Sequence, residues 1–474
     1  MNRSRWPVPV ISCVALGFVF VLASAFQQRK SFSLDGFWVS DGYGRFIEIH
    51  DTKMSIYETT SISCLPSETA EKSAVELPNG EVVFKEGDDL IHIFPGASAD
   101  SLVMHEDGSI SNVDLHRTSD KPKACGVKPE DTPQSNYAVF WQTFAEQFAL
   151  FPLYHADWGA VDHQYRPKVT STTTPEDLFG VLREMVAPFQ NAHISIGANS
   201  IKSRYQGYRP VSPIGMALAK IPPPSMREII TNERHRTREI IESKYAQGPL
   251  KPYCEGLIYF GMLKGKIGYL RILSFSGYSK SGGFPAGSQA LESALDDIFK
   301  TANDMKGLVI DVRLNTGGAD PWGVAIASRL TTARYLAYSK IIRDNVSGPL
   351  HFTEPQPAWV EPASGAGFGG PVVMLIGPDT VSAGETFSMA LMGRTPKVVF
   401  IGENTQGVFS DVLGRALPNG WRFGLPNEVY LTKDGKSFDG PGVPPDISVP
   451  VFPASDLDAG RDGAIEKAIQ LLVK

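Results

Sequence analysis

The sequence has few cysteines and no cluster of metal-binding side chains. Four cysteines and nine histidines are spread over 474 residues, and none has the paired CxxC or His/Cys spacing of a zinc site. Basic residues are also unclustered: 45 Lys and Arg accompany 51 Asp and Glu, a formal net charge of −6. A nucleic-acid-binding domain would carry a concentrated basic patch. We therefore expect no metal, no cofactor and no nucleic-acid partner.

An apolar stretch at the N-terminus has the form of a secretory signal peptide. Arg3 and Arg5 precede the apolar run 6–22, and residues 23–25, Ala-Ser-Ala, form a small-x-small cleavage site. Residues 1–25 are therefore predicted to direct export to the periplasm, the cell surface or the medium. The mature chain is still long enough for two or three domains.

Two other interpretations of this stretch are weaker. Residues 10–13, Val-Ile-Ser-Cys, fit a lipoprotein processing box, but the apolar run continues well beyond Cys13, where such a box should end it. An uncleaved membrane anchor is disfavoured because the run is marginally short for a span. We therefore expect no lipid at Cys13 and no stable membrane span after cleavage.

Three cysteines remain in the mature chain: Cys64, Cys125 and Cys254. An odd number allows at most one bridge and leaves a free thiol. Cys64 and Cys125 lie in the same N-terminal segment, which makes them the favoured pair in an exported protein.

Residues 32–117 have the pattern of a small all-β domain. Short apolar or alternating segments are separated by Asp-Gly, Asn-Gly and Gly-Asp-Asp turns. A small antiparallel sheet or barrel is predicted, with a structural or partner-binding role as the default. The polar stretch 118–135, rich in Pro, Lys and Asp, is predicted to be a linker.

Residues 136–200 switch to a helical period. Thr174-Pro175-Glu176-Asp177 opens one helix with a cap, a proline at the first position and acids in the first turn. That helix leads to His193, which in an extended segment should face away from Ile194 and Ile196. Alone, such a histidine is more often a surface or hydrogen-bonded one than a catalytic one. An earlier aromatic stripe is typical of a helix core: Phe140, Phe144, Phe148 and Phe151.

Residues 201–255 are Pro-rich and are predicted to be a connecting or substrate-facing insertion with a short helix near 226–244. From residue 256 to residue 474 the pattern becomes α/β. The first elements are a strand at 267–273, a helix at 288–305 and a strand at 308–313. Gly317-Gly318 then lets the backbone turn sharply at the strand's carboxyl end, where open α/β sheets bind ligands. The alternative is an ordinary strand-to-helix turn.

Ser382 stands between a buried strand and a helix. The apolar run 372–376 predicts a strand covered on both faces. Ser382 then begins a helix, so its hydroxyl would lie beside unpaired N–H groups at the positive helix end, as suits a nucleophile that forms an oxyanion. The alternative is a capping box formed by Ser382 and Glu385.

Four motifs in order give the chain a family resemblance. They resemble those of the C-terminal-processing and tricorn-like serine peptidases, family S41, over about residue 134 to the end. The resemblance implies a ClpP/crotonase-like core of the ββα-superhelix kind, so the fold class expected is a multidomain chain: small all-β domain, helical segment, then this α/β core. The motifs are residues 307–318, Thr380–Glu385, Gly402–Gly407 and Gly442–Ile447.

The resemblance also separates two mechanisms. The bacterial processing branch uses a Ser-Lys dyad, and the lysine position is Val408 here. The tricorn-like branch uses a histidine from the helical part and an acid three residues before Gly-Val-x-Pro-Asp, which correspond to His193 and Asp439. The resemblance therefore implies Ser382 as nucleophile, His193 as general base and Asp439 as the acid that orients the imidazolium.

The oxyanion would be held by the backbone N–H of Ala383 and of Gly317 or Gly318. Glu385 is a candidate supporting residue. No metal is implied.

The chain departs from the tricorn-like pattern at three positions. Asp439 stands where the pattern has glutamate, one methylene longer. Ala192 stands where tricorn carries a serine that links histidine to acid, and Asn191 where many relatives have aspartate. The nucleophile and the base are retained.

The function predicted is a secreted or periplasmic serine endopeptidase acting on a peptide or protein substrate. One alternative is a non-catalytic protein that binds peptides or hydrophobic ligands on the S41 scaffold, because fold alone does not imply function. A second is an esterase using the same serine. The sequence makes no prediction of oligomeric state.

Overall fold

The computed structural model describes residues 33–473, apart from 77–79, 128, 213–214, 217–222 and 345–349. The signal peptide predicted for residues 1–25 lies outside the described residues. In the described part of the chain, no helix is long and apolar enough to cross a membrane.

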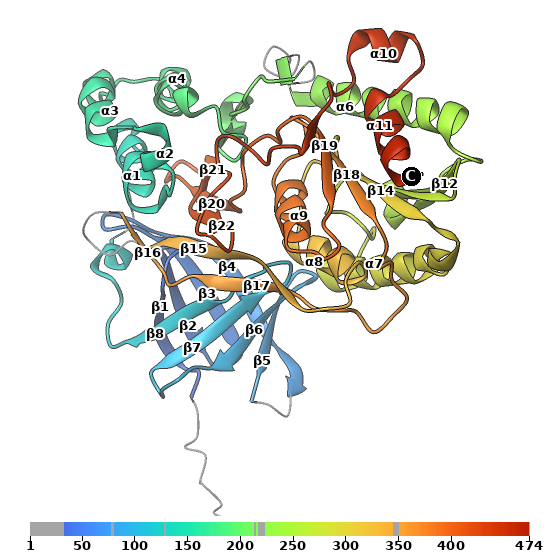
Figure 1. Ribbon diagram of the computed structural model, residues 1–474. Coiled ribbons are helices and arrows are strands. Elements are labelled where there is room, and N and C mark those ends of the chain that lie inside the picture. Colours follow the sequence, from blue (N-terminus) through green and yellow to red (C-terminus); the bar gives the residue numbers. More distant parts are fainter. Residues whose placement is uncertain are drawn as a thin grey trace, which may run out of the picture. The chain divides into compact units, whose positions relative to one another are not determined.

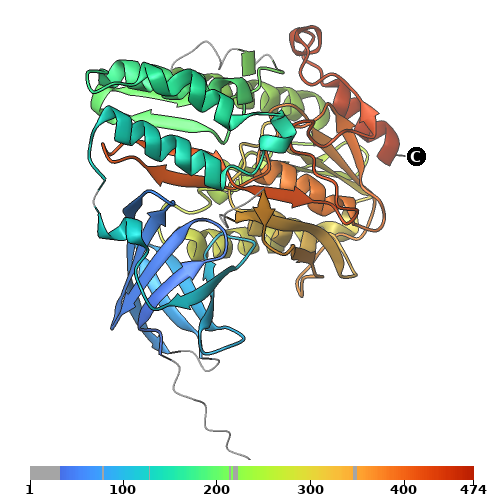
Figure 2. The ribbon, with the colours of Figure 1, turned by 90° about the vertical axis from the view of Figure 1, so that its left-hand side faces the viewer.

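The N-terminal domain is a closed barrel in which each strand pairs with its sequence neighbour and the first pairs with the last (Figures 1 and 2). The prediction of a small all-β domain is confirmed. The strands are β1 (Gly36–Ser40), β2 (Arg45–His50), β3 (Lys53–Thr59), β4 (Cys64–Glu76), β5 (Val82–Glu86), β6 (Asp89–Pro95), β7 (Ser101–Glu106) and β8 (Val113–Thr118).

Alternation of apolar and polar residues builds this barrel. In β3, Met54 and Ile56 are buried and their neighbours are less so, because successive side chains point to opposite faces of a strand. The predicted Cys64–Cys125 disulfide is present and fastens β4 to the segment after β8. Cys254 is a free, buried thiol.

Replacing both bridged cysteines by serine is expected to destabilise the barrel. The bridge joins residues 61 positions apart, and opening a loop of this length restores chain entropy to the unfolded state worth about 4 kcal/mol. Thermal unfolding of the double variant should begin at a lower temperature than that of the parent. Cys254→Ser, which opens no loop, is the control, and equal melting of parent and double variant would contradict the expectation.

A helical segment follows the barrel. Its helices are α1 (Pro133–Gln147), α2 (Phe151–Tyr154), α3 (Trp158–Tyr165) and α4 (Pro175–Val186). The cap predicted for α4 is confirmed, since Thr174 accepts from the N–H of Asp177 with Pro175 at the helix start. The aromatic stripe is core: Phe140, Phe144 and Phe148 are each 0% exposed.

The core of the α/β region is a seven-stranded sheet (Figure 1). Strands β13, β14, β18, β19 and β23 run parallel, and β11 and β12 extend the sheet antiparallel from β13. The strands are β11 (Lys251–Tyr253), β12 (Ile258–Leu263), β13 (Ile267–Ile272), β14 (Gly307–Asp311), β18 (Val372–Ile376), β19 (Val399–Gly402) and β23 (Ile447–Ser448).

Both faces of this sheet are covered, which explains the unbroken apolar run of β18. Val372, Met374 and Ile376 pack into the core that contains α7 (Gly283–Phe299), α8 (Asp320–Ser328) and α9 (Ala383–Met392). Val373 and Leu375 face the opposite core, formed with α11 (Gly463–Leu472) and the end of α6 (Pro223–Ile240). The fold class predicted from the sequence is confirmed.

Two smaller sheets and helix α10 (Ala454–Asp458) are further elements of the described chain. One sheet has the order β10 (Ser203–Gln206), β9 (Ser195–Ala198), β21 (Arg422–Pro426), β20 (Val412–Ala416). The other contains β15 (Tyr335–Asp344), β16 (His351–Phe352), β17 (Gln356–Val360) and β22 (Glu428–Leu431).

Helix positions differ in detail from the expectations. The helix expected at 288–305 is α7, which begins at Gly283 and ends at Phe299. The helix expected near 226–244 is α6, whose last turn continues as a π-helix over Ile241–Tyr245.

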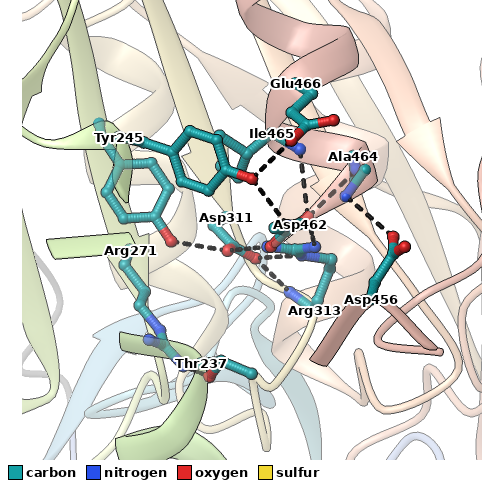
Figure 3. A network of polar contacts seen from close by, with 12 residues as sticks. Thr237, Tyr245, Arg271, Asp311, Arg313, Asp456, Asp462, Ala464, Ile465 and Glu466 are labelled. Carbon is teal, nitrogen blue, oxygen red and sulfur yellow. Dashed lines mark hydrogen bonds and ion pairs between the residues drawn. The ribbon is translucent and has the colours of Figure 1, made fainter. Parts of the chain in front are cut away.

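A buried ion network fastens α11 to the central sheet (Figure 3). The Arg313 guanidinium is 1% exposed and pairs with Asp311 at 2.7 Å and with Asp462 at 2.8 Å. Asp462 also caps α11 by accepting from the N–H of Ala464 and Ile465. One arginine after β14 therefore holds the C-terminal helix in place.

Candidate active site

Ser382 occupies a strained turn between β18 and α9. Its backbone has φ 56° and ψ −123°, a conformation that costs a non-glycine residue on the order of 1–3 kcal/mol. The Glu385 N–H donates to the Ser382 backbone carbonyl at 2.7 Å, and the two residues have the arrangement of a capping box. A sharp turn that presents a serine hydroxyl after a buried strand is the arrangement of a nucleophile elbow.

The buried Glu385 carboxylate joins Ser382 to the segment 405–408. Oε2 accepts from the N–H of Ser382 at 3.2 Å and of Val408 at 2.9 Å. Oε1 accepts from the Thr405 hydroxyl and the Gly407 N–H, both at 2.6 Å. Burial raises the pKa of Glu385 to about 7, although these hydrogen bonds lower it. The capping box predicted for Ser382 and Glu385 is therefore present, and the Glu385 carboxylate also holds the segment 405–408.

The glycine loop after β14 lies directly against Ser382. A Cβ atom built on Gly317 would lie 2.6 Å from the Ser382 Cβ. The Gly317 N–H donates to Asn315 Oδ1 at 2.9 Å and is therefore occupied. The N–H groups of Gly318 and Ala383 have no hydrogen-bond partner among the residues that the structure describes. Of the three oxyanion donors expected from the sequence, Gly318 and Ala383 remain available.

Gly317→Ala is expected to lower kcat by roughly 10²-fold or more, the loss seen when an oxyanion donor is displaced. The new methyl group would meet the Ser382 Cβ at 2.6 Å and the Val381 carbonyl at 3.0 Å, so the loop or the serine must move. Gly435→Ala is the matched control, because Gly435 also has positive φ, +72°, with no described atom within 4 Å of its added Cβ. Equal losses in the two variants would assign the effect to backbone strain alone.

His193 lies in a turn just before β9 and is 7% exposed. The sequence predicts an extended segment at His193, whereas the strand begins only at Ser195, and the His193 side chain is buried. The backbone N–H of His193 donates to Asn191 Oδ1 at 2.8 Å. The ring Nδ1 of His193 is buried without a hydrogen-bond partner in the described chain. Burial lowers the pKa of His193 to about 4, although the Asp411 charge and a backbone hydrogen bond with Ser410 raise it. The imidazole is therefore a neutral base near pH 7.

The segment 408–411 connects the three predicted catalytic residues. The N–H of Ser382 donates to the Val408 carbonyl at 3.2 Å. The next residue, Phe409, donates its N–H to Asp439 Oδ1 at 3.3 Å. The two residues after that are Ser410 and Asp411, which act on the His193 ring.

Asp439 is buried and faces this segment. Its second oxygen accepts from the Ser437 hydroxyl at 2.9 Å, and burial raises the pKa of Asp439 to about 7. No hydrogen bond among the described residues joins His193 to Ser382 or to Asp439. The carboxylate whose charge acts on His193 is Asp411.

A cleft of about 740 Å³ opens between the neighbours of Ser382 and those of His193. One wall contains Thr316, which precedes Gly317, and another contains Ser195 and Gly424, whose Cβ position would be 3.4 Å from the His193 carbonyl. Ser382 and His193 themselves are not among the described residues that line the cleft.

Two family models match the chain. Residues 266–449 match peptidase family S41, and residues 129–187 match the tricorn protease C1 domain. The chain therefore contains a peptidase family S41 domain. This confirms the resemblance predicted from the sequence motifs, and the two matched domains are those of a serine-type peptidase.

Solved structures share the fold of this S41 peptidase. A Parabacteroides merdae protein assigned as a peptidase is 24% identical, with a TM-score of 0.59 over 73% of this chain and 98% of that one. Mature CPAF is 14% identical, with a TM-score of 0.54 over 72% of this chain and 96% of its own. At these identities the likeness shows the fold alone. No curated protein sequence matches the chain as a relative.

Sequence reasoning missed the charges behind the 408–411 segment of the S41 peptidase. Lys340, 1% exposed, pairs with Asp411 at 3.2 Å and with the buried Glu428 at 3.0 Å. Glu428 also accepts from the Tyr43 hydroxyl of the barrel at 2.6 Å. These residues come from distant parts of the chain and no motif marks them. The one sequence signal is the position of Lys340 among the apolar residues of β15, because a buried lysine needs an acidic partner inside the protein.

As the pH is lowered, kcat/KM is expected to fall with a midpoint nearer pH 4 than pH 6.5. His193 must be unprotonated to act as a base, and burial lowers its pKa to about 4, so protonation removes activity only as the pH falls toward that value. Asp411→Asn should move the midpoint further down, because the Asp411 charge raises the pKa of His193. A midpoint near pH 6.5 in both proteins, measured over pH 3–9 at constant ionic strength, would contradict this.

Proposed function

We propose that this S41 peptidase hydrolyses peptide bonds through an acyl-enzyme on Ser382, with His193 as general base. The observation that carries the proposal is the strained Ser382 turn beside two available backbone donors, Gly318 and Ala383. The buried, unpaired Nδ1 of His193 supports it, because orphaned buried polar atoms are rare away from functional sites.

In the proposed reaction, His193 takes the proton of the Ser382 hydroxyl as Oγ attacks the substrate carbonyl carbon. The oxyanion accepts hydrogen bonds from the N–H groups of Gly318 and Ala383. The C–N bond then breaks as the imidazolium returns its proton to the leaving amine. Water, activated by the same histidine, releases the acyl group. Asp439 supports the imidazolium through the 408–411 backbone, together with the charge of Asp411.

We further propose that the enzyme acts outside the cytoplasm, where it would meet peptide or protein substrates. Arg3, Arg5 and the following apolar run support export. The Cys64–Cys125 disulfide supports it independently, because such bonds persist in oxidising compartments.

The test incubates the mature protein, Ser382→Ala and His193→Ala with a mixed library of unstructured peptides and reads the products by mass spectrometry. Cleavage by the parent and by neither variant is expected. A serine-directed phosphonate should label the parent at Ser382. Failure of the parent to cleave any peptide would overturn peptide hydrolysis. Labelling together with ester turnover alone would instead indicate an esterase, and no labelling would favour a binding protein.

A further inference from the structure

The cleft lined by β9, β21 and α6 has a basic lining, although the protein as a whole is acidic. It contains three arginines, Arg204, Arg234 and Arg422, and none of its described lining residues is acidic. None of the three arginines forms an ion pair within 4 Å with a described carboxylate. The formal net charge of the chain is −6, so the cleft departs from the average surface. Unpaired cations along one groove attract and hold an anionic ligand.

Two of these arginines form a row across the floor of the cleft. Gly197 in β9 pairs with Arg204 of β10 on one side and with Arg422 of β21 on the other. Directly opposed residues of neighbouring strands share a face of the sheet. Gly197 has no side chain, and its Cβ position would meet only the Arg422 carbonyl, at 3.7 Å. Two exposed guanidinium groups therefore flank an open gap.

The third arginine faces the oxyanion loop. Arg234 of α6 donates through Nη2 to the carbonyls of Leu273 at 2.6 Å and Leu314 at 3.0 Å. Its Nε is buried without a partner in the described residues. Burial and the nearby Arg271 charge lower the pKa of Arg234 to about 10. Its charge is therefore held beside the cleft without a carboxylate to balance it.

A smaller recess of about 150 Å³ continues the basic surface. It shares Thr231 and Arg234 with the cleft and adds His235, Arg238 and Arg271. Arg271 is 3% exposed, and its Nη1 has no hydrogen-bond partner in the described chain, whereas Arg238 lies 3.8 Å from Glu242. A buried guanidinium nitrogen without a partner is costly unless a ligand satisfies it.

We propose that this cleft binds a carboxylate of the substrate peptide, either an acidic side chain or the terminal carboxyl group. The inference rests on the peptidase function proposed above. The arginine row lies on the sheet that begins just after the His193 turn, since Gly197 of β9 pairs with both Arg204 and Arg422. Arg234 supplies a second contact nearer the oxyanion loop.

The test measures binding in the inactive full-length variant Ser382→Ala, so that it does not depend on turnover. Fluorescein-labelled decapeptides with one glutamate are compared with glutamine counterparts, each with a free or an amidated C-terminus. The expected result is roughly tenfold tighter binding of the carboxylate member of a pair, as for one charged hydrogen bond. This preference should fall as salt is raised. A preference for glutamate over glutamine would identify an acidic side chain as the bound carboxylate, and a preference for the free over the amidated C-terminus would identify the terminal carboxyl group.

When Arg422→Gln or Arg204→Gln is combined with Ser382→Ala, the preference for the carboxylate peptide should fall to about twofold. Arg236→Gln is the matched control: it lies on α6, two residues from Arg234, pairs with Asp458 and is absent from the cleft lining. No preference in the parent, an equal loss in Arg236→Gln, or no binding of any peptide would overturn the proposal. Failure of hydrolysis with the carboxylate preference retained would instead overturn the peptidase mechanism alone.

Discussion

Replacing Ser382 by alanine is expected to lower kcat by roughly 10⁶-fold, the loss typical of a serine protease without its nucleophile. The Glu385 carboxylate, which accepts from the backbone N–H of residue 382 at 3.2 Å, remains in the variant and holds the start of α9. Alanine meets the same backbone strain as serine at φ 56°. The variant should therefore fold as the parent does and bind substrate with little change in affinity.

Single-turnover assays on a peptide found in the library would measure this loss. Ser388→Ala is the control on the same helix: its hydroxyl donates to the Gly384 carbonyl at 2.8 Å and faces the core. That variant should keep its activity while losing about 1 kcal/mol of stability. Residual activity of Ser382→Ala within tenfold of the parent would rule out Ser382 as the nucleophile.

The parts of the site that sequence reasoning predicted are those that depend on local chain order. Ser382 stands where a buried strand meets a helix, and Glu385 reaches back to it within one turn. The Thr174 cap was predictable for the same reason. In each case the interacting groups lie within a few residues, so spacing alone is enough.

The parts that could not be predicted depend on strand register between distant segments. The row of Arg204, Gly197 and Arg422 exists because β10 and β21 each pair with β9 in one register, and a shift of one residue in either pairing would turn the arginine of that strand to the other face. The charge of Asp411 on His193 likewise arises only after folding. Closure of the barrel by β1 and β8 belongs to the same class of contacts.

Replacing Arg313 by methionine is expected to destabilise the enzyme by about 3–5 kcal/mol, the usual loss when one partner of a buried ion pair is removed. Methionine fills much of the volume but leaves Asp311 and Asp462, 4% and 6% exposed, without their cation. Although burial raises the pKa of Asp311, the Arg313 charge and hydrogen bonds outweigh it and hold the pKa at about 2. Without the Arg313 charge and hydrogen bonds, the pKa of the buried Asp311 carboxyl is expected to rise.

Urea unfolding of Arg313→Met at pH 7 would measure the loss. Arg334→Met is the control, because the Arg334–Glu361 pair is exposed on both sides and such pairs contribute about 0–1 kcal/mol. Adding Asp311→Asn to Arg313→Met should recover part of the stability, since it removes one of the two unpaired charges. If the free energy of unfolding falls equally little in Arg313→Met and in Arg334→Met, α11 is held by its apolar face alone. The alternative result, a large loss with partial recovery in the double variant, assigns the anchoring of the C-terminal helix to the ion network (Figure 3).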